Sequence, residues 1–436
     1  MATQRIPSWP QLSGRRQVAV ADTPDARPRR LPTPVKALYG VGALGEAAFT
    51  TAIPFVFFYY TVGLGVPGTL VGAALFLGLC ADAIVDPFFG SWSDNIKSRF
   101  GRRIPLMAIA GPLLAVSVGL LFSPPAGMSD WAMFVWLAGW AVAVRGFYSM
   151  FHVPFIALGA EMSGDYDERS AVVAWRMVFF ILAGVLVTGL AYSVFLKGGL
   201  QLPERYPAFG WTVAAMIVGG AGLCVVGSVR QAARLPGVPP VDQHLLRRLP
   251  GEVLEIFRNR SFRVLFIAAV LSYAAVGVHQ AFTTHAYVFV WRLEPGMIQT
   301  VTFAFLGGLF AGVPLTPVVS RRVEKRNTVL IGMGLVALAW MTLGLARLTG
   351  LFTATGAEAV LPLAVLVGLA GLGSGFCAIA YPSMMADAAD EHEHLFGRRR
   401  EGLYFAGLGF AFKFGQGIGT LVAGRALDLM RFPQAV

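Results

Sequence analysis

The sequence predicts an all-α membrane protein made of two related helical bundles, and three observations support that fold class. Of the 436 residues, 56% are hydrophobic and only 14% are charged, too little polar surface for a soluble domain of this length. The apolar residues form runs of about 20 or more, the length at which a helix crosses about 30 Å of hydrocarbon. Lys and Arg gather in alternate loops between these runs. Because lipid offers the backbone no hydrogen bonds, such runs must be helical.

The apolar runs predict eleven membrane spans, six before a long polar stretch and five after it. They cover roughly 36–62, 68–92, 104–124, 131–160, 169–196, 208–229, 262–290, 296–319, 328–346, 360–386 and 402–428. The 51 glycines suit the close approach of helices in lipid. Cys80, Cys224 and Cys377 fall within apolar runs, so we expect free thiols that pack as small apolar side chains.

Residues 1–34 combine arginines with prolines and contain no apolar core of a signal peptide. This composition predicts a disordered basic cytosolic tail and no cleaved leader. The tail, Lys36 just after it and every second loop hold 26 of the 35 Lys and Arg residues, whereas the loops on the other side hold four. The positive-inside rule therefore predicts a cytoplasmic amino terminus. The same distribution accounts for the net charge of +11 without nucleic acid binding.

The polar stretch 230–260 is predicted to be a cytosolic linker between an amino-terminal six-helix bundle, 35–229, and a carboxy-terminal bundle, 261–436. Basic loops follow the second and the eighth span, at 94–103 and 320–326. Equivalent loops in equivalent places fit the parallel repeat of the major facilitator fold. The alternative is that both loops carry only the charge that sets membrane topology.

Six charged residues are predicted within spans, where an Asp or Arg costs about 2.5–3.5 kcal/mol. Three are acidic and three are basic, so we expect them to face a cavity and to pair with one another instead of facing lipid. The six are Glu46, Asp82, Asp86, Arg145, Arg176 and Lys413.

Asp82 and Asp86 are four residues apart on one helix, so they share a face at about 6 Å along the axis. Two ionised carboxylates at this spacing repel, and a cation between them or a proton on one of them relieves the repulsion. Oxygen ligands suit Na⁺, H⁺ or Li⁺ and do not suit a transition metal. The alternative is a structural set of salt bridges to Arg145, Arg176 or Lys413.

Arg176 and Lys413 are candidate anchors for a hydroxylated or anionic substrate, and Lys413 also suits the role of counter-ion to the aspartates. Arg145, Tyr148 and His152 share a face of the fourth span. His152 suits either a proton carrier or a neutral hydrogen-bond donor opposite the aspartate pair.

The remaining histidines of the spans are weaker candidates. His279 and His285 fall on opposed faces of the seventh span, where packing or polar lining is the simpler interpretation. The sequence contains no metal-spaced cluster of His, Cys and Asp, no phosphate loop and no nucleophile elbow. We therefore predict neither an enzyme nor a cofactor, only a coupling cation, Na⁺ or H⁺.

Three ordered motifs carry a family resemblance. DAIVDPFFGSWSD at 82–94, followed by RFGRRIP at 99–105, resembles the second-span signature of the glycoside–pentoside–hexuronide:cation symporters, the melibiose-permease-like branch of the major facilitator superfamily. HVPFIAL at 152–158 is similar to a second motif of that family. YPSMMADAAD at 381–390, which leads to GRRREG at 397–402, is similar to a third. The resemblance extends from about residue 36 to 428.

The resemblance implies roles for individual residues. Asp82 and Asp86 match the cation-site carboxylates of the family, Arg176 its substrate-contacting arginine, Lys413 its span-eleven lysine, and Tyr148 a substrate-side tyrosine. Asp94, Arg102 and Arg103 would belong to an inner gate whose salt bridges break as the halves rock.

Three departures from the family pattern stand out. His152 replaces an aspartate that binds cation and sugar in melibiose permease, and a histidine before Val-Pro-Phe is similar to the sodium-dependent lysophospholipid transporters. Glu46 adds an acid in the first span that compensates for some of the lost negative charge. The family has twelve spans, so the last helix of the second half is expected to be missing from these residues.

The sequence therefore predicts a secondary active transporter that couples a small solute, a sugar or glycoside, to Na⁺ or H⁺ by alternating access. A lysophospholipid-like amphipath is the alternative substrate, and a non-transporting membrane sensor or scaffold is the alternative class. The predicted partners are the solute and the lipid bilayer. We expect a monomer in a bacterial inner membrane.

Overall fold

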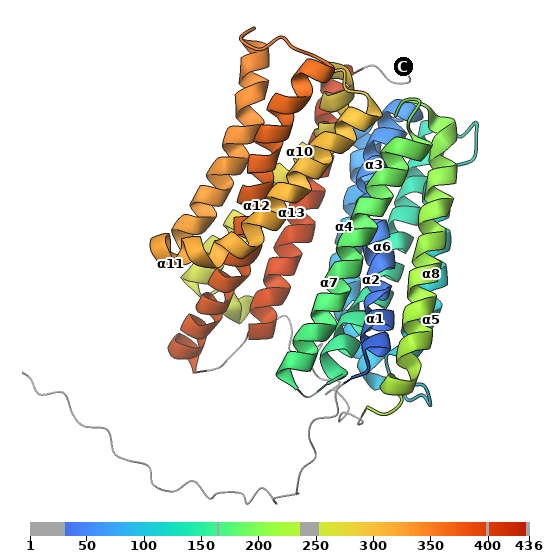
Figure 1. Ribbon diagram of the computed structural model, residues 1–436, viewed down its shortest axis with the longest axis vertical. Coiled ribbons are helices and arrows are strands. Elements are labelled where there is room, and N and C mark those ends of the chain that lie inside the picture. The colour runs from blue at the N-terminus through green and yellow to red at the C-terminus, as the bar shows by residue number, and fades with distance from the viewer. Residues whose placement is uncertain (1–30, 164, 236–252, 398–400, 433–436) are drawn as a thin grey trace, which may run out of the picture.

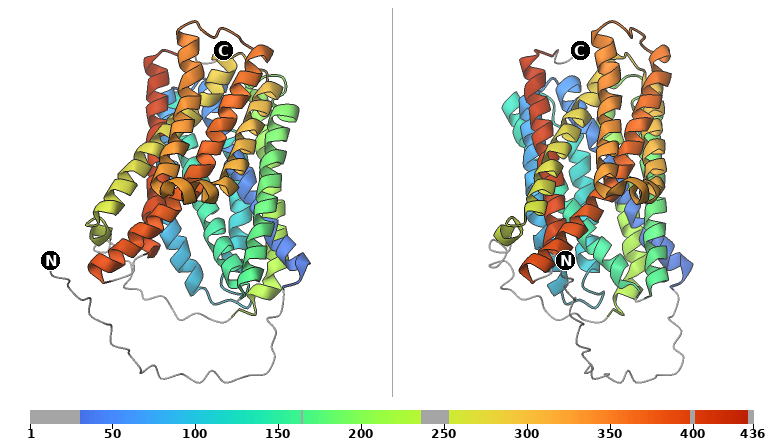
Figure 2. Two further views of the ribbon diagram at one scale, coloured as in Figure 1. Left: turned by 60° about the vertical axis from the view of Figure 1, so that its left-hand side comes forward. Right: turned by 90° about the vertical axis from the view of Figure 1, so that its left-hand side faces the viewer.

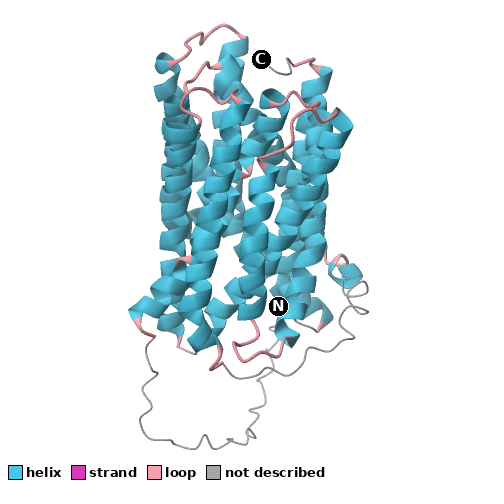
Figure 3. Ribbon diagram, turned by 90° about the vertical axis from the view of Figure 1, so that its right-hand side faces the viewer, coloured by secondary structure: helices cyan, strands magenta, loops and turns pink. Residues whose placement is uncertain are grey.

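The computed structural model describes residues 31–163, 165–235, 253–397 and 401–432. Within these ranges every regular element is helical, and Figure 3 accordingly draws cyan helices joined by pink loops, without a magenta strand. Residues 1–30 of the predicted tail and 236–252 of the predicted linker lie outside the described residues. The tail was predicted to extend to residue 34, but the first helix already begins at Thr33. The long helices run side by side from one end of the molecule to the other (Figures 1 and 2).

The amino-terminal half contains six spans. The first is interrupted at Val41 and Ile53, so it comprises three short helices and a π-helical turn, whereas the others are continuous through most of their length. In this half α2 packs against α7 and α8, α4 against α6, and α5 against α6 and α8. The elements are α1 (Thr33–Gly40), α2 (Gly42–Ala52), α3 (Pro54–Phe58), η1 (Tyr59–Gly63), α4 (Gly68–Asn95), α5 (Ile104–Leu121), α6 (Asp130–Glu161), α7 (Tyr166–Gly189), η2 (Leu190–Phe195), η3 (Pro203–Arg205) and α8 (Tyr206–Ala232).

The carboxy-terminal half repeats this packing. Here α10 packs against α13, as α2 does against α7, and α11 packs against α12, as α4 does against α6. This correspondence supports the predicted parallel repeat. The elements are α10 (Arg260–His285), η4 (Ala286–Val290), α11 (Pro295–Leu348), α12 (Ala357–Phe396) and α13 (Glu401–Leu429).

The described helices account for the eleven predicted spans. Nine of them are long and apolar enough to cross a membrane. One of the nine, α11, holds two spans, because the chain breaks at Glu324 (φ 68°) between the predicted spans 296–319 and 328–346. The remaining span is α13, which carries Lys413 and Gln416 and is therefore less apolar.

The third motif forms a helix where the sequence predicted a loop. The interval 387–401 was expected outside the spans, yet α12 continues to Phe396 and ends at Gly397 (φ 71°). Hydropathy drops at Asp387 because the helix leaves the apolar region there. One face nevertheless remains buried, and His392 packs against Phe396 at 4.6 Å between ring centroids. The polar residues therefore mark the end of the span but not the end of the helix.

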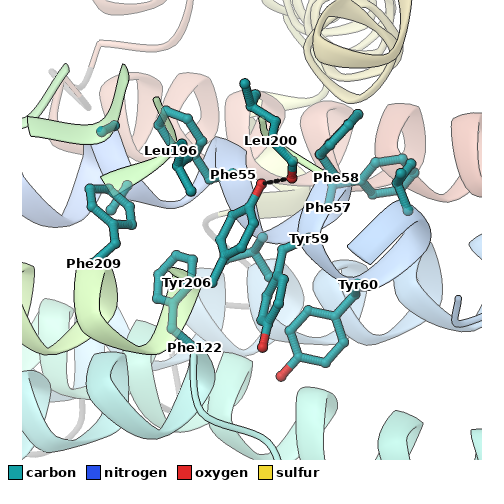
Figure 4. Packing of buried hydrophobic residues seen from close by; sticks show 14 of the residues in the cluster. Phe55, Phe57, Phe58, Tyr59, Tyr60, Phe122, Leu196, Leu200, Tyr206 and Phe209 are labelled. Atoms are coloured by element: carbon teal, nitrogen blue, oxygen red, sulfur yellow. Dashed lines mark hydrogen bonds between the residues drawn. The ribbon is translucent and has the colours of Figure 1, made fainter. Parts of the chain in front are cut away.

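The two ends of the molecule differ in chemistry. We call the end that carries the loops 94–103 and 320–327 the basic end and the other the opposite end; in Figure 1 the basic end is at the bottom. At the opposite end, Figure 4 shows a buried aromatic cluster of the amino-terminal half. Tyr206 stacks on Tyr59 at 4.2 Å and donates a 2.8 Å hydrogen bond to the Leu200 carbonyl.

The two halves contact each other closely along α4 and α13. At the opposite end the two backbones leave no room for a side chain at Gly424, because a Cβ there would lie 2.0 Å from the Gly68 carbonyl oxygen. The carboxylate of Asp428 accepts hydrogen bonds of 2.8 Å from the backbone N–H groups of Gly68 and Thr69. An acid at these free N–H groups is favoured by the helix dipole, so α13 caps the start of α4.

Two further polar contacts join the halves at the opposite end. Thr61 of η1 hydrogen-bonds the ring of His285 on α10 at 3.0 Å. Ser193 of η2 donates to the side-chain oxygen of Gln299 on α11 at 2.7 Å. With the α4–α13 seam, these contacts close the opposite end.

Candidate functional site

The first predicted carboxylate, Asp82, lies in the middle of α4 and is 1% exposed. Its Oδ1 accepts a 2.6 Å hydrogen bond from Ser149 on α6 and lies 3.1 Å from the ammonium of Lys413 on α13. Its Oδ2 lies 3.5 Å from the guanidinium of Arg145. A buried carboxylate is stabilised only by such partners, and this one has them from two other helices.

The second carboxylate, Asp86, is one turn further along α4 and more exposed. Its Oδ2 contacts the same Lys413 ammonium at 2.5 Å. One ammonium group thus lies between two carboxylates and offsets their repulsion. We call Asp82, Asp86, Arg145, Ser149 and Lys413 the bridging cluster, because it joins the two halves through α4 and α13.

A second charged group lies wholly in the amino-terminal half. Glu46 on α2 is 6% exposed, and its Oε1 is 3.4 Å from Nδ1 of His152 on α6. Its Oε2 is 3.6 Å from Nε of Arg176 on α7. Tyr148 stacks on His152 at 4.9 Å, with its hydroxyl 3.3 Å from Nδ1. We call Glu46, Tyr148, His152 and Arg176 the open cluster.

The open cluster has unsatisfied polar atoms. Oε2 of Glu46 and Nε of Arg176 are both buried without a hydrogen-bond partner. The first is an acceptor and the second a donor, and at 3.6 Å they are too far apart to satisfy each other. Buried polar groups are normally hydrogen-bonded, so this pair has unused binding capacity.

The predicted pairing of the six intramembrane charges is present, and the partners are now defined. Lys413 and Arg145 pair with the aspartates, whereas Arg176 pairs with Glu46. The direct contacts of His152 are with Tyr148 and Glu46, not with either aspartate. The histidine therefore belongs with the predicted substrate residues.

The predicted gate residues form a network at the basic end. Arg103 contacts Asp94 at 2.5 Å and Glu161, at the end of α6, at 2.7 Å. Arg102 reaches the same Glu161 oxygen at 2.9 Å. All these partners belong to the amino-terminal half, so in this conformation the ion pairs tie α4, α5 and α6 to one another.

The carboxy-terminal half has an ion pair in the equivalent place. Lys325, just after the break in α11, contacts Asp387 of α12 at 2.7 Å. The basic loop after the second span therefore pairs with an acid on the fourth span, and the basic loop after the eighth span pairs with an acid on the helix of the tenth span. The sequence left open that these loops serve only to set membrane topology. Their basic residues also form ion pairs between helices, so they do more than that.

Sequence reasoning missed two parts of this region. Ser149 was not a candidate, although its place four residues after Arg145 puts it on the same helix face. Gln416, one turn after Lys413, donates a 2.6 Å hydrogen bond to Gln280 on α10. The weaker candidates His279 and His285 are both engaged, one stacked on Trp340 and the other bonded to Thr61.

A transition-metal site is not formed by the residues that the structure describes, because no group of three His, Cys, Asp or Glu has suitable geometry. The chemistry available at the site consists of binding a small cation between carboxylates and hydrogen-bonding a polar solute. Cation binding and solute binding are steps of transport, and neither requires a side chain that reacts chemically with the solute.

Solved structures support the fold. The nucleoside transporter NupG superposes with a TM-score of 0.60 at 14% identity, covering 91% of this chain and 90% of that chain. A bacterial homologue of the human lysosomal transporter Spinster, in an inward-facing and unoccupied conformation, gives a TM-score of 0.60 at 12% identity over 92% of this chain and 84% of that chain. Both likenesses cover nearly the whole chain, so they support the predicted fold across both helical halves.

Sequence relatives support the family. The isoprimeverose transporter of Lactiplantibacillus pentosus is 25% identical over 87% of this chain and 77% of its own length. The glucuronide carrier protein homologue of Escherichia coli is 25% identical, with 88% and 80% covered. An uncharacterised symporter of Synechocystis is 23% identical, with 91% and 86% covered.

These likenesses confirm the resemblance to the glycoside–pentoside–hexuronide:cation symporters and the prediction of an integral membrane transporter, not an enzyme. The model of the family described as MFS/sugar transport protein matches residues 38–435, nearly all of the described chain. The chain therefore belongs to the MFS/sugar transport protein family.

Proposed function

We propose that this transporter couples the movement of a hydroxylated small solute, a sugar or glycoside, to Na⁺ or H⁺ moving in the same direction. The observation that carries the proposal is the Lys413 ammonium held by both Asp82 and Asp86. A cation already occupies the point between the carboxylates, and it is attached to the other half of the protein. A free cation that took its place would release α13 from α4.

Charge balance explains why this exchange would couple two substrates. Breaking a buried ion pair on one side leaves the other charge unpaired, which costs about 3–5 kcal/mol. A coupling cation at the aspartates removes that cost for them, and an oxygen of a solute bound in the neighbouring open cluster removes it for Lys413. Binding of both ligands is then more favourable than binding of either one alone, which is the energetic requirement for symport.

The open cluster is the proposed solute site. A single hydroxyl group both donates and accepts a hydrogen bond. Placed between Oε2 of Glu46 and Nε of Arg176, it would donate to the first atom and accept from the second, satisfying two buried groups that have no other partner. Sugars present several such hydroxyls, and the names of the isoprimeverose and glucuronide relatives agree with this chemistry.

The conformation fits one state of an alternating-access cycle. The opposite end is closed by the Asp428 cap and the contacts of Thr61 and Ser193, whereas the gate ion pairs at the basic end lie within each half. We propose that the basic end is cytoplasmic, which makes this the inward-facing state of a bacterial inner-membrane protein. All charged groups of the site come from one chain, so a monomer suffices.

The test is uptake by proteoliposomes that contain the purified protein, under a Na⁺ gradient or a pH gradient. A panel of radiolabelled monosaccharides, glycosides and lysophospholipids supplies the solute. Asp82→Asn and Asp86→Asn should each abolish cation-driven accumulation, because each removes one charge from the pair. Asp130→Asn, at the exposed start of α6, is the matched control and should retain it.

The results separate the competing functions. Accumulation driven by either gradient with a sugar or glycoside, lost in both variants, supports the proposal. Accumulation of lysophospholipids alone identifies the amphipath transporter instead. Undiminished coupled uptake in both aspartate variants would refute the assignment of the cation site.

A further inference from the structure

A cavity of about 350 Å³ separates the two halves beyond the open cluster. The amino-terminal half contributes residues of α2, α3 and α7 to its wall, and the carboxy-terminal half contributes α10, α11 and α12. Phe180, on the wall, lies one turn after Arg176 on α7, so the cavity begins next to the proposed solute site. Its volume lies within the range of small-molecule sites, which are about 300–1,000 Å³.

The wall of this cavity is neutral but able to accept hydrogen bonds. Of the described residues that line it, none is Asp, Glu, Lys or Arg. The hydroxyls of Thr283, Thr302 and Ser374 donate to carbonyls of their own helices at 2.6–2.8 Å. Each oxygen keeps a lone pair for another donor. An uncharged group with hydroxyl donors fits this wall, whereas a charged group would find no counter-ion.

An aromatic platform forms one side of the cavity. His279 of α10 and Trp340 of α11 stack in parallel, with ring centroids 3.6 Å apart and an interplanar angle of 11°. Both line the cavity. Two stacked rings from different helices give a rigid, flat aromatic surface, and such surfaces favour contact with another ring.

The platform is connected to the bridging cluster. Gln280, next to His279, lines both this cavity and a smaller one that contains Arg145. The same Gln280 accepts the hydrogen bond from Gln416, one turn beyond Lys413. The open cluster belongs to the amino-terminal half and the platform to the carboxy-terminal half, so a solute that extends from one to the other would contact both halves.

We propose that His279 and Trp340 form a specificity-determining subsite for the uncharged second ring of a glycoside, whose first sugar ring binds at Glu46 and Arg176. The inference rests on the proposed function, because it assumes a hydroxylated solute at the open cluster. On this proposal, residues of the carboxy-terminal half determine whether the transporter prefers two-ring solutes over free monosaccharides.

The test compares methyl and 4-nitrophenyl glycosides of the same sugars, namely glucose, galactose, xylose and glucuronic acid, by calorimetric binding to the purified full chain with and without Na⁺. For a sugar that binds, we expect the 4-nitrophenyl form to bind about threefold to tenfold more tightly, the size of one aromatic contact. Trp340→Leu and His279→Leu should reduce this ratio towards one and change the affinity for the methyl form by less than about twofold. Trp131→Leu, at the exposed end of α6, is the control and should keep the ratio.

Each result decides the matter. A ratio that survives both substitutions, or an equal loss for both forms, would overturn the subsite. If either leucine variant does not fold, Trp340→Phe, whose smaller ring offers less stacking area, should lower the ratio, and an unchanged ratio there would overturn the subsite. If no glycoside binds to the unaltered protein, the proposed function itself fails and the subsite with it. Binding without any difference between the two forms refutes the subsite alone.

Discussion

The bridging cluster and the open cluster both pair buried acids with bases, but the contacts differ in length and in the halves that they join. In the bridging cluster, Lys413 holds two carboxylates at 3.1 and 2.5 Å, and it joins the two halves. In the open cluster the charged contacts are 3.4 and 3.6 Å long, all residues come from one half, and two buried atoms lack partners. The bridging cluster has short ion pairs between two halves that move during transport, so its charges can change partners between conformations. The open cluster has unpaired polar atoms within one half, which suits the binding of a ligand. Three substitutions within the clusters and one outside them test this difference.

The largest effect is expected for Lys413→Met. The change leaves Asp82 buried with the Ser149 hydrogen bond and with Arg145, at 3.5 Å, as its remaining charged partner, and removing one partner of a buried pair costs about 3–5 kcal/mol. Cation-driven uptake should be lost and the thermal unfolding midpoint in detergent should fall. Lys413→Arg keeps the charge and is the control for stability. A Met variant that still accumulates solute under a cation gradient would show that the ammonium is not part of the switch.

A smaller effect is expected for Ser149→Ala. The serine hydroxyl donates to the Asp82 carboxylate at 2.6 Å, and a hydrogen bond to a charged group contributes about 1.5–3 kcal/mol. We expect the cation concentration for half-maximal uptake to change by roughly tenfold or more, with solute affinity nearly unchanged. Ser117→Ala removes an equally buried hydroxyl that bonds only to its own helix, and should leave both constants alone. Equal effects of the two serine changes would contradict a specific role for Ser149.

The open cluster should respond in the opposite way to Arg176→Lys. Lysine keeps the positive charge but loses the planar fork and the Nε–H that faces Glu46. Solute affinity should fall by roughly tenfold, about 1.4 kcal/mol, while the cation dependence of uptake stays the same. Arg205→Lys, exposed at the opposite end, is the matched control. If Arg176→Lys instead changes the cation dependence and leaves solute affinity unchanged, the two clusters do not have separate functions.

The smallest effect is expected outside both clusters, at Lys325→Ala. The Lys325–Asp387 pair is 42% and 57% exposed, and exposed pairs contribute about 0–1 kcal/mol. Arg103→Ala removes a buried guanidinium from the equivalent place and should destabilise the protein more. Thermal unfolding in detergent measures both. A Lys325 effect as large as that of Arg103 would mean that the carboxy-terminal gate is packed more tightly than this conformation shows.

The parts of the site that the sequence predicted are those with a high energetic cost. Asp82, Asp86 and Lys413 stood out because a charge inside a span must have a compensating partner or a function. Ser149 did not stand out, because a serine in a membrane helix usually bonds to its own backbone. The platform of His279 and Trp340 could not be predicted either, since neither residue is unusual in a helix and their stacking joins α10 to α11.

The sequence alone determined the helical spans and the inventory of three acids and three bases inside the membrane. Those properties follow from local hydropathy and from the cost of charge in lipid, which depend on residue type. Only the tertiary structure decided the partners. Lys413 contacts Asp86 across 327 residues of sequence, and it does so because α4 and α13 pack side by side at small residues. Pairing depends on distances between helices, and hydropathy carries no information about those distances.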